Sequence, residues 1–207
     1  IQELVGLYDY GKAVTTLQYT LTQGFWLGKY EVTQAQWLAL MGTNPSYFKG
    51  SQNPVESISW EDVQAFCQKA RNELRLPTEA EWEYACGAGN TEAYCFGDNE
   101  MQLGVYAWYY GNSGKQTHPV GQKKPNTWGL YDMYGNVCEW CQDWRHDDYT
   151  SAPTDGSAWE GSPTALGRVF RGGSWDYYAT DFRMAFQTGL DPSSRGYGLG
   201  FRVALVR

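Results

Sequence analysis

The sequence predicts an α+β domain in which a few helices come first and short, twisted antiparallel strands joined by long structured loops follow. Three observations support this fold class. Hydroxyl-capped helix starts occur in the first half of the chain, whereas from Gly87 onward Gly, Asn and Pro interrupt short aromatic segments. Ten Trp and sixteen Tyr favour strands and a substantial core. No Gly-, Ser- or Pro-rich linker divides the chain, so a single domain over residues 1–207 is expected.

Two helices are predicted to begin at capping boxes. Thr33-Gln-Ala-Gln36 and Thr78-Glu-Ala-Glu81 each place a hydroxyl before the helix and a Gln or Glu three residues later. These two side chains satisfy amide donors that the first helical turn leaves without partners. The second of the two helices is expected to be short, over residues 79–85.

A longer helix is predicted between them, from about Ser59 to Arg75. Ser59 can cap it, and Glu61 and Asp62 lie in the first turn, where the helix dipole favours acids. Pro77 ends the segment because its ring cannot continue a helix. Apolar residues recur at helical spacing and form one buried stripe: Val63, Phe66, Cys67, Ala70 and Leu74.

The chain ends on an alternating segment, Gly200-Phe-Arg-Val-Ala-Leu-Val206, that is typical of a strand. The domain therefore divides into four parts. Residues 1–24 form an amino-terminal extension or the first strands, residues 25–175 a scaffold, residues 176–198 a segment of distinct composition, and residues 199–207 a closing strand.

Charge argues against nucleic-acid binding, and hydropathy argues against a membrane-spanning helix. The formal net charge is −7 and the isoelectric point is near 4.8, which argues against nucleic acid because its binders concentrate Lys and Arg. No apolar stretch approaches the ~20 residues of a membrane-spanning helix. The start at Ile1, without a methionine, is compatible with a lipid anchor upstream of residue 1.

The five cysteines do not describe a disulfide framework, because their number is odd. We expect free and mostly buried thiols, with a Cys86–Cys95 or other bridge as the alternative. Cys138 and Cys141 point to opposite faces of an extended segment, so they are not expected to share a metal.

The composition of the last 33 residues, from Trp175 to Arg207, differs from that of the rest of the chain. They contain no Lys, Glu or Asn, although the preceding 174 residues contain 27 of them. Tyr, Asp, Ser, Thr, Gly, Leu and Phe fill the segment instead. Tyr, Ser and Gly give adaptable contact surfaces their area and hydrogen bonding at low entropy cost. This composition indicates a binding face.

A series of motifs resembles the formylglycine-generating-enzyme, or sulfatase-modifying-factor, family from about Phe25 to Ala204. The motifs are Gly28-Lys-Tyr-Glu-Val-Thr33, Gln36-Trp37, Pro54-Val55 with Ser59-Trp60, Arg75 to Ala85, Asn126, Gly129 to Trp140, Arg168 to Trp175, and Gly200-Phe-Arg202. The resemblance implies a C-type-lectin-type fold. One fold carries many different sites, so it does not settle the chemistry.

The enzymes of this family use two cysteines, five residues apart, shortly after a Gly-Gly-Ser-aromatic motif. When this chain is registered on Gly172-Gly173-Ser174, Tyr177 and Phe182 occupy those positions. Neither side chain can ligate copper or attack a substrate. The resemblance therefore predicts a protein without this enzymatic activity and without a redox cofactor.

The carboxy-terminal segment resembles the variable proteins of diversity-generating retroelements, including treponemal members of that class. The resemblance implies that template adenines are mutated, mainly in Asn codons, which can become Asp, Tyr, Ser, Thr, Gly, Leu or Phe but not Lys, Glu, Gln, Met or Trp. The unreachable residues Trp175, Met184 and Gln187 all occupy frame positions. The predicted variable, ligand-binding residues are Asp176, Tyr177, Tyr178, Thr180, Asp181, Phe186, Thr188, Gly189, Leu190, Asp191, Ser194, Gly196, Tyr197 and Gly198. Phe182 can belong either to this set or to the core.

A calcium site is predicted around a glycine turn. The side chains of Asp132 and Glu139 and the carbonyl groups of Gly135 and Val137 supply the hard oxygen ligands that Ca²⁺ accepts. Enzymes of the resembled family bind calcium at the matching positions, usually with Asn where Asp132 stands. The role of such an ion would be structural.

Together these observations predict a monomeric, non-enzymatic binding protein displayed at the cell surface, outside the cell, as an outer-membrane lipoprotein. Its partner would be a protein or another cell-surface molecule, whose identity a diversified face does not reveal. Two alternatives remain: an oxidoreductase of the sulfatase-maturation type acting through other residues, and a carbohydrate-binding lectin.

Overall fold

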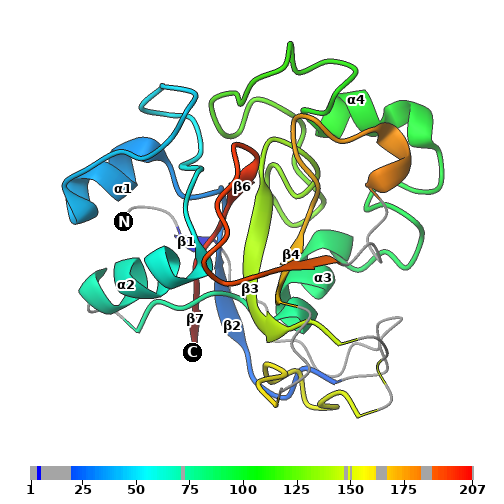
Figure 1. Ribbon diagram of the computed structural model, residues 1–207. Helices are drawn as coiled ribbons and strands as arrows, with labels where there is room; N and C mark the ends of the chain where they lie inside the picture. The colour runs from blue at the N-terminus through cyan, green and yellow to red at the C-terminus, as the bar shows by residue number, and fades with distance from the viewer. Residues whose placement is uncertain are drawn as a thin grey trace.

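The structure is a computed structural model of the 207-residue chain. It describes residues 4–5, 20–70, 73–146, 149, 151–161, 167–182 and 188–206. Two small sheets lie side by side near the middle of the molecule, with helices around them and long loops at both ends (Figure 1). This is the predicted α+β arrangement of few helices and short strands, and it is a C-type-lectin-type fold.

The first sheet has the order β1-β2-β7 and is antiparallel. Its strands are β1 (Leu4–Val5), β2 (Phe25–Gly28) and β7 (Ala204–Val206). It therefore joins the beginning of the described chain to its end.

The second sheet has the order β5-β4-β3-β6. Its strands are β5 (Thr188–Leu190), β4 (Arg168–Arg171), β3 (Cys138–Trp144) and β6 (Leu199–Gly200). β3 pairs antiparallel with β4 and parallel with β6. The predicted single closing strand is thus two strands in different sheets, because residues 201–203 leave β6 and cross to β7.

The capped helices form where the sequence predicts them. α1 (Gln34–Met41) and α3 (Glu79–Gly87) both have complete capping boxes, from Thr33 and from Thr78. α2 (Trp60–Ala70) ends before the predicted Arg75. Glu73 has a left-handed φ of 55°, and Arg75 pairs with Ala204 as an isolated bridge. The left-handed turn at Glu73 and the bridge from Arg75 to Ala204 are incompatible with a helix that continues to Arg75.

Three shorter helical segments were not predicted. They are η1 (Glu100–Gln102), α4 (Leu103–Tyr106) and η2 (Ala179–Asp181). Each is only three or four residues long, so none carries a periodic apolar pattern that a sequence would reveal.

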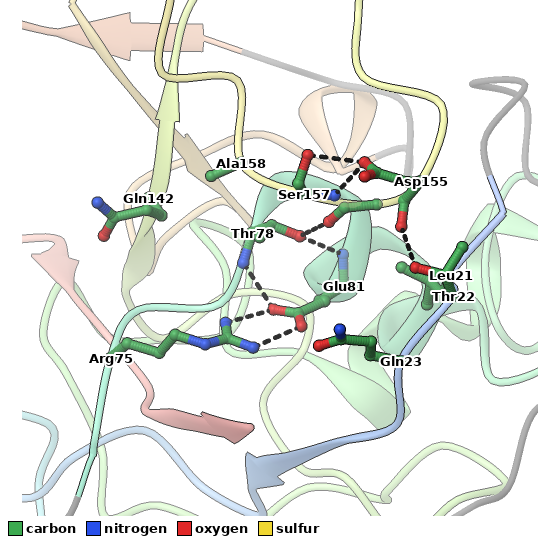
Figure 2. A pocket seen from close by; sticks show the side chains of 11 residues that line it. Leu21, Thr22, Gln23, Arg75, Thr78, Glu81, Gln142, Asp155, Ser157 and Ala158 are labelled. Carbon is green, nitrogen blue, oxygen red and sulfur yellow. Dashed lines mark hydrogen bonds and ion pairs between the residues drawn. The ribbon is translucent and has the colours of Figure 1, made fainter. Parts of the chain in front are cut away.

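A polar pocket of about 310 Å³ lies beside the start of α3, between the 21–23 segment and the 155–158 loop (Figure 2). The Arg75 guanidinium forms a two-point ion pair with Glu81 at 2.6 and 2.7 Å. Glu81 also accepts from the Thr78 amide as part of the capping box. Arg75 and Glu81 therefore serve the helix start, whereas the third charged group that lines the pocket, Asp155, accepts from the Ser157 amide and hydroxyl.

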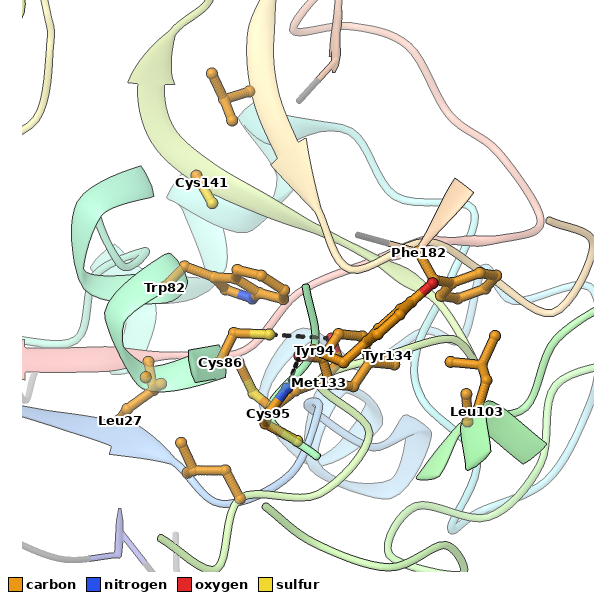
Figure 3. Close-up of a cluster of buried hydrophobic side chains, with 14 of the residues drawn as sticks. Leu27, Trp82, Cys86, Tyr94, Cys95, Leu103, Met133, Tyr134, Cys141 and Phe182 are labelled. Carbon is orange, nitrogen blue, oxygen red and sulfur yellow. Dashed lines mark hydrogen bonds between the residues drawn. The ribbon is translucent and has the colours of Figure 1, made fainter. Parts of the chain in front are cut away.

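The core consists of two main clusters of buried side chains. One packs Trp82, Tyr134 and Phe182 with sulfur-containing side chains (Figure 3). The other stacks Trp37 on Phe66, with ring centroids 5.2 Å apart. Five free cysteines lie in these clusters or beside them: Cys67, Cys86, Cys95, Cys138 and Cys141. All five cysteines are therefore free and buried, as the sequence predicted.

Candidate ligand-binding face

The scaffold holds the 176–198 segment by its main chain. The Trp175 indole N–H donates to the Tyr197 carbonyl oxygen at 3.0 Å. Three scaffold amides also donate to carbonyl oxygens of the segment: Tyr110 to Tyr177, Ser57 to Gly196, and Cys138 to Gly198. Because these acceptors are backbone oxygens, the hydrogen bonds form whichever side chains the segment carries.

Four of the predicted variable residues are exposed and lie on the two parts of the segment that Trp175 joins. They are Asp176, Tyr178, Thr180 and Tyr197, named here the ligand face. The exposed fraction is 60% for Tyr178 and 56% for Tyr197. Exposed large rings that gather on one surface mark interaction sites more often than scattered ones do.

Tyr177 is only partly exposed. It packs against both core clusters, and its ring centroid lies 6.3 Å from that of Phe182. Tyr177 therefore anchors the segment to the core, in contrast to the four residues of the ligand face.

Phe182 is a core residue, with 2% of its surface exposed. Its ring would meet a Cβ atom at Gly173 within 2.6 Å, so the Gly-Gly turn and this ring fit closely together. The structure thus decides the open question of its placement in favour of the core.

The glycines and the serine near the end of the segment differ in the space around them. A Cβ atom at Gly196 would meet nothing closer than 3.7 Å. A Cβ atom at Gly198 would lie 2.9 Å from the Ser174 Cβ. Ser194 is partly buried. Gly196 therefore has room for a side chain, whereas any larger residue at Gly198 must displace Ser174.

Four predicted residues lie on the edge strand β5 or directly after it, and Thr188 pairs with Phe170, next to the end of β4 that leads to the ligand face. Thr188, Gly189 and Leu190 form the edge strand β5, and Leu190 pairs with Arg168 at the start of β4. The ligand face follows the other end of β4, after Arg171. Leu190 and Asp191 are exposed, so they belong to the surface but not to the ligand face. Asp181 lies in η2, and Phe186 is outside the described residues.

The frame around the segment is deeply buried. Phe201 and Arg202 have no exposed surface. Arg202 donates to both carboxylate oxygens of Glu139 at 2.6 Å and to the carbonyl oxygens of Gly28 and Tyr131 at 2.9 Å. Arg202 therefore links three parts of the chain, near residues 28, 131 and 139. A buried guanidinium needs such charge-assisted hydrogen bonds.

The predicted calcium ligands have other partners in this arrangement. Besides Arg202, the Glu139 carboxylate accepts from the Trp82 indole at 2.6 Å. Asp132 accepts from the Gly121 amide with one oxygen, and its buried Oδ1 has no hydrogen-bonding partner among the described residues. Burial raises the pKa of Asp132 to about 6.

One carboxylate that the sequence analysis missed lies in the same cluster. Glu31 is buried and accepts from the Asn136 side chain at 2.7 Å and from the Val137 amide at 3.0 Å. Within the described ranges, no three His, Cys, Asp or Glu side chains are arranged to hold a metal ion. Asp132 Oδ1 is the available oxygen, and the calcium site remains a prediction.

The profile of the sulfatase-modifying factor enzyme 1-like domain matches residues 5–206. The chain belongs to this family. The formylglycine-generating enzyme of Streptomyces coelicolor is 35% identical over 84% of this chain but only 59% of its own length, so the chain spans about three fifths of that enzyme. Chaperone protein LppX of Paenibacillus barcinonensis is 31% identical over 86% of this chain and 79% of its own length.

Among solved structures, Treponema denticola variable protein 1 is 33% identical to this chain, with a TM-score of 0.83. The similarity covers 99% of this chain and 92% of that one. The resemblance to treponemal variable proteins, predicted from the sequence, is confirmed.

The thiols of this family member are poorly suited to catalysis. All five cysteines are buried. Burial raises the pKa of Cys67 and Cys138 to about 12 and that of Cys95 to about 11, and it also raises the pKa of Cys86 and Cys141. A thiol is nucleophilic only as thiolate, so none of these groups is activated near neutral pH.

Proposed function

We propose that this protein is a non-enzymatic ligand-binding protein whose carboxy-terminal face is diversified by retroelement-driven adenine mutagenesis. The observation that carries the proposal is the division between side chain and main chain in the 176–198 segment. The scaffold binds carbonyl oxygens of the segment, and the four residues of the ligand face are exposed at the surface. A binding surface can then change without loss of the structure that supports it.

The similarity to Treponema denticola variable protein 1 supports the same function. By analogy with that class, we propose display at the cell surface through a lipid anchor upstream of residue 1. No helix in the described part of the chain has the length and apolarity needed to cross a membrane.

The rival function is oxidoreductase activity of the sulfatase-maturation type, which the identity to formylglycine-generating enzymes favours. Against it, registering the chain on Gly172-Gly173-Ser174 puts Tyr177 and Phe182 where the resemblance implies the two catalytic cysteines, and Phe182 is buried. Titration of the native protein with a thiol reagent separates the two functions. We expect no fast-reacting thiol before unfolding, and a rapidly labelled cysteine together with bound copper would favour the enzyme.

The decisive experiment for diversification is the nucleotide sequence of the gene beside a near-identical template repeat. We expect the two sequences to differ only at template adenines, within the codons of residues 176–198. Differences spread over all four bases would contradict the proposal. A lectin would instead keep the same contact residues in every copy of the gene.

A further inference from the structure

Two tyrosines outside the 176–198 segment are also exposed. Tyr47 has 61% and Tyr110 has 45% of its surface exposed. Tyr47 lies after α1, and Tyr110 lies after α4. Neither residue belongs to the set that the codon argument predicts to vary.

Each of these tyrosines contacts one tyrosine of the ligand face. The ring centroids of Tyr47 and Tyr197 are 4.6 Å apart at an interplanar angle of 31°. Those of Tyr110 and Tyr178 are 4.9 Å apart at 45°. Both separations lie in the range of favourable aromatic pairs. The exposed aromatic surface therefore continues from the segment onto two separate loops.

The loop that carries Tyr47 is fixed by buried polar side chains of the scaffold. The Phe48 amide donates to the Glu56 carboxylate at 2.8 Å, and the Phe48 carbonyl oxygen accepts from the Gln34 side chain at 2.7 Å. Gln34 and Glu56 are both buried. The Phe48 ring also packs edge-on against Trp175 at 5.3 Å. Tyr47 is thus held in place before any ligand arrives.

The loop that carries Tyr110 is fixed in a comparable way. The Asn112 side chain accepts from the Tyr109 amide at 2.9 Å and donates to the Ala107 carbonyl oxygen at 2.9 Å. The Tyr110 amide itself donates to the Tyr177 carbonyl oxygen at 3.0 Å. The backbone of residue 110 is therefore attached directly to that of the 176–198 segment.

We infer that Tyr47 and Tyr110 are constant contact residues of the binding face and supply part of the affinity for protein ligands whatever the variable residues are. This inference rests on the proposed function. A tyrosine held by a rigid loop offers a large apolar ring and a hydroxyl at a small entropy loss. A smaller residue at position 178 or 197 uncovers more of its constant neighbour, so the constant ring compensates for lost contact area.

The test uses the full chain with residues 176, 178, 180 and 197 randomised, displayed on phage and selected for binding to lysozyme. Tyr47→Ser and Tyr110→Ser are then introduced into several selected clones, and Tyr47→Phe serves as the conservative variant. Tyr149→Ser is the matched control, because Tyr149 is 41% exposed and contacts Glu79, near the opposite end of β3 from Cys138. Melting temperatures confirm that each variant is folded.

In most clones we expect Tyr47→Ser or Tyr110→Ser to weaken binding about 10-fold or more, as loss of an interface tyrosine commonly does. Tyr47→Phe and Tyr149→Ser should keep the affinity within about twofold. Serine variants that are folded and bind as tightly as their parents would overturn the inference but not the proposed function. If the library yields no lysozyme binder at all, the proposed function fails, and the inference fails with it.

Discussion

Arg202 and Glu139 form a two-point ion pair that is completely shielded from solvent, with both N–O distances at 2.6 Å. The pair joins the residues that follow β6 to the first residues of β3. Burying two charges is unfavourable unless each keeps all its partners, and here the Trp82 indole and two carbonyl groups complete the set. The stability of the frame therefore depends on every member of this cluster.

Removal of one partner should be strongly destabilising. We expect Glu139→Gln or Arg202→Met to lower the free energy of unfolding by about 3–5 kcal/mol, because each leaves an uncompensated buried charge or donor. Urea denaturation measures the change. The exposed pair of Arg195 and Asp62 is the control, with side-chain exposures of 54% and 33%. Arg195→Ala should change the free energy of unfolding by less than about 1 kcal/mol. If disruption of the buried pair and of the exposed pair destabilised the protein equally, burial would not be the cause.

The ligand face should be separable from the fold. Tyr178→Ser and Tyr197→Ser should change the free energy of unfolding by no more than about 0.5–1 kcal/mol, since both side chains are largely exposed. Phe182→Ala and Phe201→Ala should each lower it by about 3–5 kcal/mol through loss of buried ring contacts. Chemical denaturation of the four variants makes the comparison. Large losses at the exposed tyrosines would mean that the face also supports the fold.

Two glycines of the predicted variable set should respond differently to substitution. Gly196→Ala should be nearly neutral, because its new methyl group enters open space. Gly198→Ala should destabilise by about 1–3 kcal/mol, because its methyl group meets the Ser174 side chain at 2.9 Å. Thermal melts of the two variants, compared side by side, test this. In natural copies of the gene we accordingly expect position 196 to vary more than position 198.

The raised pKa of Asp132 predicts a pH dependence of stability. Burial raises this pKa to about 6, above the value of about 4 for an exposed aspartate. The folded protein then binds more protons than the unfolded chain between these values, so the contribution is fully present below about pH 4 and is lost as the pH rises through 6. Asp132→Asn keeps an acceptor for the Gly121 amide and removes the charge. With a chelator present to remove calcium, the Asp132→Asn variant should show a smaller decline in melting temperature between pH 4 and 6. It should also be more stable than the parent at pH 7. If the melting temperatures of variant and parent changed in parallel with pH, Asp132 would not be the source of the pH dependence.

Calcium should oppose this loss if the predicted site exists. At pH 7 and above, Asp132 is charged and its Oδ1 is free to bind a cation. Addition of millimolar CaCl₂ to chelator-treated protein should then raise the melting temperature, because a ligand that binds only the folded state stabilises it. Asp132→Ala should abolish the response. Unchanged melting, with no calcium found by metal analysis, would remove the site.

Local signals in the sequence predicted most of the scaffold. The capping boxes at Thr33 and Thr78 predicted two helix starts correctly, because all of the interacting groups lie within four residues of each other. The predicted end of the second helix was wrong by about five residues, because Arg75 pairs with Ala204, a partner far away in the chain that helical periodicity does not reveal. The two-sheet path of the last strand depends on partners far away in the chain, which no local pattern encodes.

Local sequence also predicted some of the exposed residues of the candidate site, whose role in binding stays a prediction. Codon logic selects residues that can vary, and it found Asp176, Tyr178 and Tyr197, which the structure exposes together. It does not distinguish Tyr177, whose ring reaches the core, from its exposed neighbour. It also cannot find Tyr47 or Tyr110, since each meets the segment across more than sixty residues of chain.

The hydrogen bond from the Trp175 indole to the Tyr197 carbonyl oxygen has an evolutionary consequence. A donor that recognises only the peptide group accepts every amino acid at position 197 alike. Under the proposed diversification, a single mutational step can therefore replace the ring at position 197, and no compensating mutation is needed to keep this hydrogen bond.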